Sequence, residues 1–216
     1  MTADPHQSPF LIVAADDYGY APGYNRGILE AAEAGAIDCA SAMVGHRWCD
    51  PEPILAAGIE IGIHLEPPGD DLRGQLDAFE RLFGRPPAYL DGHRHCHARP
   101  GRAERVARVA AERRLPVRSV DDDHRALLRR AGVWTPDRLV GRLKPSEPTL
   151  PALLEGGAAL PRSVTEWMVH PGYRDPRAGS SYDAAREDDL RVLLRVRPAL
   201  AERATCGTHA DALSDE

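Results

Sequence analysis

The 216-residue chain is rich in arginine but has little lysine and no excess of positive charge. Lys144 is the one lysine among 27 basic residues, which we attribute to coding bias rather than to function. The formal net charge is −6 and the pI is near 5.9, which argues against a nucleic-acid-binding surface. No apolar stretch approaches the roughly 20 residues that span a bilayer. With 43% hydrophobic and 28% charged residues, the composition is typical of a soluble globular protein.

The chain also lacks CxxC pairs and a recognisable targeting segment. None of its four cysteines forms such a pair, which excludes a zinc knuckle or a redox motif of that type, although Cys96 lies within a histidine-rich segment. Residues 1–9 lack the basic start and apolar core of a signal peptide, so we expect a cytoplasmic protein. We further expect those nine residues to be a flexible tail and the whole chain to form one domain.

Short apolar runs alternate along the chain with helical segments. The candidate strands are residues 10–16, 38–44, 59–65, 87–92, 115–120, 164–169 and, more weakly, 203–209. Most are unbroken rather than alternating, which is typical of parallel strands covered on both faces. Repeated strand–helix units predict an α/β fold with about seven parallel strands, arranged as a barrel or as an open sheet. We expect residues 144–162 to form a loop plus one helix.

The helical segments show amphipathic spacing. Leu72, Leu76, Phe79 and Phe83 share one predicted helical face, and similar stripes lie near residues 24–32, 106–110 and 190–194. These stripes predict helices that cover the sheet.

Asp16 and Asp17 follow the apolar run of residues 10–15 directly. Adjacent carboxylates at the end of a buried strand repel each other, and a bound cation would relieve that repulsion while leaving one carboxylate free as a base. Taken alone, the pair is also compatible with a solvated turn or a helix N-cap.

Three later apolar runs end in a histidine, at His64, His93 and His170. In both α/β arrangements ligands bind at the carboxyl ends of the strands, so these histidines and the two aspartates indicate one active site at that edge. Asp17, His64 and His93 would supply one carboxylate and two imidazoles to a metal that also holds a water.

These residue types predict hydrolysis of an amide or ester. Asp16 would remain as a base beside the water, and His170 would protonate the leaving group. The ligand set suits Zn²⁺, and also Mn, Co or Ni, better than Mg²⁺.

Four segments, in order, resemble the motifs of the YdjC-like carbohydrate deacetylases, also called the ChbG/HpnK family. They are residues 11–28 (LIVAADDYGYAPGYNRGI), 61–65 (IGIHL), 89–97 (YLDGHRHCH, followed by Pro100) and 169–173 (VHPGY). The resemblance extends from residue 10 to about residue 210. It implies a distorted (β/α) barrel, one divalent metal ion, often magnesium in relatives, and removal of N-acetyl groups from amino sugars such as chitooligosaccharides. It also implies a homodimer.

By motif position, the resemblance implies that Asp17, His64 and His93 bind the metal, that Asp16 is the catalytic base and that His170 is the general acid. Arg118 is similar to an arginine that the family places after a later strand. It would either steady Asp16 as an ion pair or bind substrate.

Several other residues within these motifs have more than one possible role. In an extended segment His95 and His97 would face the same side as His93, so they would approach the metal, bind substrate or support the site. Tyr18 and Tyr173 would either stack against a sugar ring or simply pack.

The chain departs from the family after Gly69, where it enters a helix directly and many relatives have a long insertion. The substrate cleft is therefore expected to be more open, or closed by another chain. This leaves two alternatives: a hydrolase acting on a hopanoid-type glycolipid or another small acyl compound, and a non-catalytic sugar- or metal-binding protein.

Overall fold

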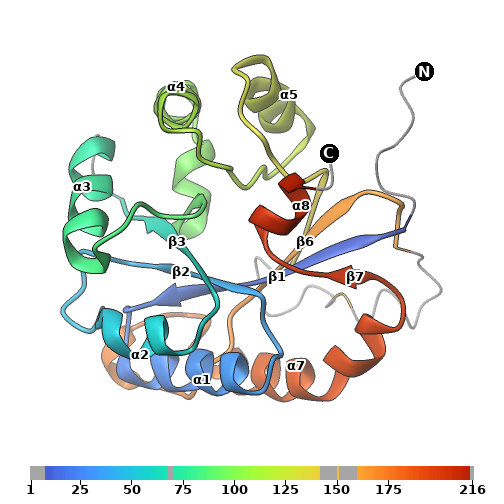
Figure 1. The fold of residues 1–216 in the computed structure, drawn as a ribbon. Coiled ribbons are helices and arrows are strands. Elements are labelled where there is room, and N and C mark those ends of the chain that lie inside the picture. The colour runs from blue at the N-terminus through green and yellow to red at the C-terminus, as the bar shows by residue number, and fades with distance from the viewer. Residues whose placement is uncertain (1–7, 68–70, 142–149, 151–159, 215–216) are drawn as a thin grey trace.

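A computed structural model describes residues 8–67, 71–141, 150 and 160–214. Within them, seven parallel strands form one sheet that curls into a half-barrel (Figure 1), which confirms the predicted α/β fold. The strands are β1 (Phe10–Tyr18), β2 (Cys39–Ala42), β3 (Glu60–Leu65), β4 (Leu90–Gly92), β5 (Arg138–Gly141), β6 (Val164–Val169) and β7 (Thr205–Cys206). Their order is β4-β3-β2-β1-β6-β5, and β7 pairs with the first two residues of β1.

Helices cover the outer face of the sheet and close one end of its interior. They are α1 (Pro22–Glu33), α2 (Pro51–Ala56), α3 (Leu72–Phe83), α4 (Ala103–Arg113), α5 (Asp122–Arg130), α7 (Arg186–Ala201) and α8 (His209–Ser214). Three short 3₁₀ segments are η1 (His93–Ala98), η2 (Pro176–Ala178) and η3 (Asp183–Ala185). In Figure 1, α1 and α7 lie side by side beneath the sheet, and α8 follows β7 directly.

Strand β1 is buried on both faces, as its unbroken apolar run predicts. Leu11, Val13 and Ala15 join the larger apolar core together with residues of the outer helices. The alternate residues of β1 point into the half-barrel, where a smaller core includes Phe10 and Ile12. Asp16 continues this inward-facing series at the carboxyl end of the strand.

Helix α3 shows why the amphipathic stripes are good predictors. The four residues of its predicted face are all buried. Asp71 caps the helix, because its Oδ1 accepts a hydrogen bond from the backbone N–H of Gly74 at 2.8 Å. The helix ends at Gly84, whose φ of +67° is a left-handed conformation that glycine adopts without strain.

Two strand predictions differ from the structure. Residues 115–120 do not form a strand, and Val117 makes only an isolated parallel bridge with Leu90. Pro116 lacks the N–H that a regular ladder needs. Strand β5 was missed because it lies at the edge of the sheet and is only partly buried, so its sequence carries no apolar run.

Other predictions fall partly outside the described residues. These are most of the segment 144–162 and residues 1–7 of the expected tail. No helix in the described part of the chain is long and apolar enough to cross a membrane.

Candidate active site

A bulge in β1 turns both adjacent aspartates towards one cavity. Ala15 pairs with Ala40 of β2, but Tyr18 pairs with Ala42, so β1 contains one extra residue between them. Asp17 has a φ of +74°, in the left-handed region that aspartate tolerates better than most residues. Because consecutive side chains of a regular strand face opposite sides, this bulge is what allows the two carboxylates to share a pocket.

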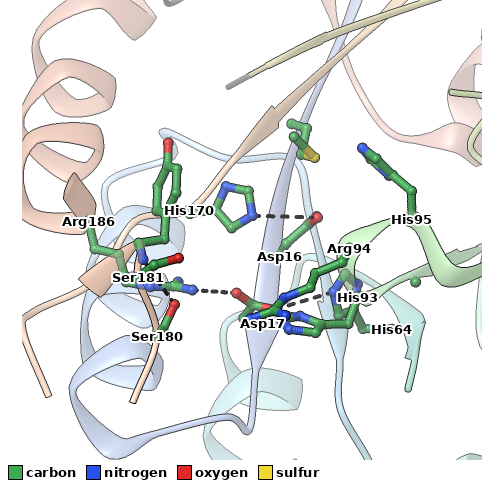
Figure 2. A pocket seen from close by; sticks show the side chains of 13 residues that line it. Asp16, Asp17, His64, His93, Arg94, His95, His170, Ser180, Ser181 and Arg186 are labelled. Carbon is green, nitrogen blue, oxygen red and sulfur yellow. Dashed lines mark hydrogen bonds and ion pairs between the residues drawn. The ribbon is translucent and has the colours of Figure 1, made fainter. Parts of the chain in front are cut away.

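The pocket lies at the carboxyl ends of the strands and has a volume of about 110 Å³, enough for several water molecules or a small ligand. Figure 2 shows the side chains that converge on it. The five residues expected at this edge all line it: Asp16, Asp17, His64, His93 and His170.

The donor atoms of Asp17, His64 and His93 form a compact cluster. Asp17 Oδ1 lies 2.9 Å from His93 Nδ1 and 3.3 Å from His64 Nε2. One ligand atom from each of the three residues lies within 4.8 Å of the others. One carboxylate oxygen and two imidazole nitrogens are a donor set that fits a divalent transition metal.

The orientation of His64 is fixed from behind by a carboxylate. Its Nδ1 lies 2.7 Å from Asp91 Oδ1 and 3.0 Å from Ser41 Oγ, which leaves Nε2 directed at Asp17. Metal-binding histidines typically make such a contact through their other nitrogen. Burial lowers the pKa of His64, but Asp91 and Asp17 outweigh burial and hold it well above 6.5. A cation at Nε2 would replace the proton that this environment otherwise retains.

Asp16 is held by a buried arginine. Arg118 Nη1 and Nη2 donate to the two carboxylate oxygens at 2.7 and 2.8 Å, and the Arg118 side chain has 0% exposure. Of its two predicted roles, this geometry matches the ion pair. Burial raises the pKa of Asp16, but Arg118 and His64 outweigh burial and place it well below 3.8. Asp16 is therefore ionised at neutral pH.

Arg118 also links Asp16 to other buried carboxylates. Its Nε donates to Glu166 Oε1 at 2.6 Å, and its Nη1 lies 2.9 Å from Asp91 Oδ2. One guanidinium thus orients the carboxylate beside the pocket and the carboxylate behind His64.

His170 faces Asp16 across the pocket, with its Nε2 4.0 Å from Asp16 Oδ2. Burial lowers the pKa of His170 below 6.5, although Asp16 and Asp17 act in the opposite direction. The ring is therefore mainly neutral at neutral pH, so it must gain a proton before it can act as an acid.

The expectation that residues 93–97 are extended is wrong. The segment forms the 3₁₀ turn η1, in which Arg94 and His95 have φ values of 49° and 53°. The turn leaves His95 on the pocket wall, where burial and Arg118 lower its pKa to about 4. It sends His97 into the interior, where its Nε2 lies 3.0 Å from the backbone oxygen of Arg118.

Neither candidate stacking tyrosine lines the pocket. Tyr18 is 1% exposed and donates its hydroxyl hydrogen to the carbonyl of Asp50 at 2.7 Å. The Tyr173 hydroxyl bonds Glu30, and Arg26 lies 4.0 Å above its ring. The structure favours the packing interpretation for both.

A second wall of the pocket was not predicted. It comes from residues 180–182 and from Arg186, which begins α7 and donates to Asp17 Oδ2. These residues belong to no motif and lie more than 160 positions from Asp17. The one sequence signal that could have placed them near the site is their position shortly after His170.

The fold and the site define the class of protein: an α/β half-barrel with a cluster of side chains that could hold a metal at the carboxyl edge of its parallel strands. Within it, the chain belongs to the family described as YdjC-like protein, whose model matches residues 10–66 and 69–202. This confirms the family resemblance of the four motifs.

Named relatives and solved structures agree with this assignment. A chitooligosaccharide deacetylase from Yersinia pestis (strain Pestoides F) is 27% identical over 241 aligned residues, covering 89% of this chain and 94% of the relative. A protein from Enterococcus faecalis V583, whose description proposes cellobiose-phosphate cleavage, superposes with a TM-score of 0.80 at 22% identity, over 96% of this chain and 99% of the other. The peptidoglycan deacetylase PdaC from Bacillus subtilis has a TM-score of 0.52 at 12% identity, over 99% and 93%. The two structures show a shared fold.

Proposed function

We propose that the chain is a metal-dependent carbohydrate deacetylase that removes N-acetyl groups from amino sugars or their oligosaccharides. The observation that carries the proposal is the convergence in one pocket of the cluster of Asp17, His64 and His93 with an ionised Asp16. Membership of the YdjC-like family and the name of the Yersinia relatives support a sugar substrate.

Asp17, His64 and His93 would hold the metal, with Asp91 fixing the ring of His64. When bound there, a divalent metal acidifies a water molecule and polarises an acyl oxygen. We favour Zn²⁺ because two of the three donors are imidazoles, and Mg²⁺ is the alternative.

Asp16 is the proposed base. Its two bonds with Arg118 keep it ionised and pointed into the pocket, so it can accept a proton from a water that attacks the acyl carbon. The same ion pair makes Asp16 a weak base. Its role therefore depends on a water that is already acidic.

His170 is the proposed acid for the departing amine. It is neutral before the reaction, and its Nε2 lies 4.0 Å from Asp16 Oδ2. A small movement would let it take the proton that Asp16 has accepted. His170 would then pass that proton to the nitrogen as the C–N bond breaks, giving acetate and a free amino sugar.

The short connection from β3 to α3 favours one alternative substrate class. It joins Leu65 to Leu72 without the insertion found in many relatives, so a bulkier acyl compound such as a hopanoid-type glycolipid is the second candidate. A purely binding protein is disfavoured, because metal binding needs neither Asp16 nor His170 in the pocket. The cytoplasmic location, the single domain and the homodimer stay predictions.

The test is acetate release from N-acetylated chitooligosaccharides. Chelator should abolish it, and Zn²⁺ or Mg²⁺ added back should restore it. Asp16→Asn should lose activity, whereas Asp122→Asn is a matched control, because the Asp122 side chain is 99% exposed and does not line the pocket. Chelator-insensitive release, or full activity of Asp16→Asn, contradicts the proposal. Release from a glycolipid but from no amino sugar selects the second candidate.

A further inference from the structure

Arg186 is a buried cation in the wall of the pocket that no motif accounts for. It is 1% exposed, and it approaches Asp17 from the side opposite His64 and His93 (Figure 2). Its Nη2 donates to Asp17 Oδ2, whereas the two histidines face Oδ1. Arg186 therefore leaves the histidine-facing oxygen of Asp17 available.

The remaining donors of this guanidinium are unused. Its Nε and Nη1 are buried and have no hydrogen-bond acceptor among the described residues. Buried charged donors without an acceptor are costly, so they mark a place where another group is expected to bind. This observation is independent of the contact with Asp17.

The guanidinium is also held in place. Its Cζ lies 3.5 Å from the centre of the Tyr24 ring, a cation–π contact. A Cβ atom at position 172 would come within 3.1 Å of Arg186 Cδ, so Gly172 provides the space for the side chain. Arg186 is thus fixed before any ligand arrives, which is the condition under which a donor stabilises a transition state effectively.

The chemistry of the pocket indicates what such a donor would bind. An amine that leaves with an added proton carries no negative charge and gains nothing from a cation. The acyl oxygen gains negative charge as water attacks, and hydrogen bonds from arginine to a charged oxygen are about twice as strong as neutral ones. Arg186 neighbours Asp17, and therefore the centre where the acyl group would react.

We propose that Arg186 is a further catalytic residue, which donates a hydrogen bond to the acyl oxygen and stabilises its developing negative charge. This inference rests on the proposed deacetylase function. As the water oxygen bonds to the acyl carbon, the C=O π electrons move onto the acyl oxygen. Arg186 donates a hydrogen bond to that oxygen and stabilises its negative charge. When the C–N bond breaks, that pair re-forms the C=O bond, and the nitrogen leaves with the proton from His170.

The first test compares Arg186→Gln with Arg177→Gln under saturating metal. Arg177 also pairs with an aspartate, Asp175, but its side chain is 59% exposed and lies outside the pocket. Loss of one transition-state donor should lower kcat of Arg186→Gln about 100- to 1000-fold, with KM and metal affinity changed far less. Arg177→Gln should keep the wild-type kcat. Wild-type kcat in metal-saturated Arg186→Gln would show that Arg186 only positions Asp17, and would overturn the inference.

Two further variants distinguish loss of the hydrogen-bond donor from a folding defect. Arg186→Lys keeps the positive charge beside Asp17 and should retain part of the activity. Arg186→Ala should be rescued by added guanidinium ion, because the ion can occupy the space left above Tyr24. A rate that does not respond to guanidinium in a folded, metal-loaded Arg186→Ala protein counts against a direct role.

A binding measurement separates this inference from the proposed function. Acetate carries two oxygens on one carbon, as the acyl group does once water has added to it. Metal-loaded wild type should bind it about tenfold or more tightly than metal-loaded Arg186→Gln, the scale of one charged hydrogen bond. Equal acetate affinities overturn the role of Arg186, even in a wild type that is an active deacetylase. A wild type that hydrolyses no acetylated substrate refutes the function, and acetate binding still decides whether Arg186 contacts acyl oxygens.

Discussion

Among the described residues, histidine–carboxylate clusters lie at both ends of the half-barrel interior, and the pocket described above lies at one end, where Asp16, His64 and Asp91 form a group that shares His64 with the first cluster. The open cluster is Asp17, His64 and His93. The closed cluster is Cys39, Glu60 and His209, whose candidate ligand atoms also lie within 4.8 Å of one another. Similar donors therefore occur at both ends, and donor chemistry alone does not distinguish a site from a structural element.

The closed cluster uses most of its polar groups within the fold, and His209 Nε2 is the member without a hydrogen bond in the described part of the chain. Glu60 Oε1 accepts from the backbone N–H of His209 at 3.1 Å and lies 2.8 Å from its Nδ1, while Glu60 Oε2 accepts from the N–H of Ala210 at 3.2 Å. Glu60 thus anchors the start of α8. Tyr89 stacks on the His209 ring at 4.0 Å between centroids and excludes any ligand on that side.

The two clusters are connected through buried charges. His209 Nε2 lies 3.6 Å from Glu166 Oε2, and the other oxygen of Glu166 accepts from Arg118, which in turn holds Asp16. The comparison teaches that the buried contacts of the closed end link β3 to the start of α8 and to Arg118, and so hold the barrel together. At the open end, the unused donors of Arg186 lie in the wall of a pocket that can admit a ligand.

The largest effect is expected from the open cluster. His93→Ala should lose the bound metal and more than about 10³-fold of the activity, because several kcal/mol of charge stabilisation disappear with the metal. Glu60→Gln, the matched change at the closed end, should keep both. Metal content and acetate release measured on the same preparations check this, and equal metal loss in the two variants would break the comparison.

The closed cluster should instead govern stability. His209→Gln leaves Glu60 and Glu166 without their shared partner, and removal of one member of a buried charged network costs about 3–5 kcal/mol. Urea unfolding of the metal-loaded protein should show this loss, with metal stoichiometry unchanged. Loss of a metal equivalent in His209→Gln would mean that the closed cluster is a second metal site.

Asp91→Asn should have an intermediate effect at the open end. It removes the carboxylate that fixes the ring of His64, and loss of such a partner typically lowers metal affinity about 10- to 100-fold. Competition with a chelator of known affinity measures the change. Unaltered affinity would show that Ser41 alone suffices to orient His64.

The most gradual effect concerns pH. Burial lowers the pKa of His209, but Cys39, Glu166 and Glu60 outweigh burial and raise it well above 6.5. The folded state therefore retains a proton that the unfolded state releases, so this contribution is fully present below about pH 6.5 and declines above it, with a slope of up to about 1.4 kcal/mol per pH unit. The difference in unfolding free energy between wild type and His209→Gln should shrink from pH 6 to pH 9. A constant difference would mean that His209 is neutral.

Much of the open cluster was predictable because each member ends an apolar run. Asp16, Asp17 and His64 lie at the carboxyl ends of strands whose unbroken hydrophobicity is visible in the sequence, and parallel strands end at one edge. The bulge that turns Asp17 beside Asp16 was not predictable, because spacing does not encode a positive φ. The same holds for His97, which two left-handed residues redirect into the interior.

The remaining gaps arise from contacts between distant residues. Arg186 contacts Asp17, 169 positions away in the sequence, and His209 contacts Glu60, 149 positions away. No periodic pattern in the sequence predicts either contact. Strand β5 was not predicted for a different reason: an edge strand needs no apolar run. Local patterns therefore revealed the strands and their ends, whereas the second wall of the pocket and the closed cluster required the fold.

Titration of the metal-free protein with Zn²⁺, with acetate release from an N-acetylated chitooligosaccharide measured at each step, tests the central claim most directly. We expect activity to rise in proportion to bound metal and to saturate at one equivalent per chain. Activity in the metal-free protein, or metal binding that produces no acetate release from any amino sugar, would contradict the account.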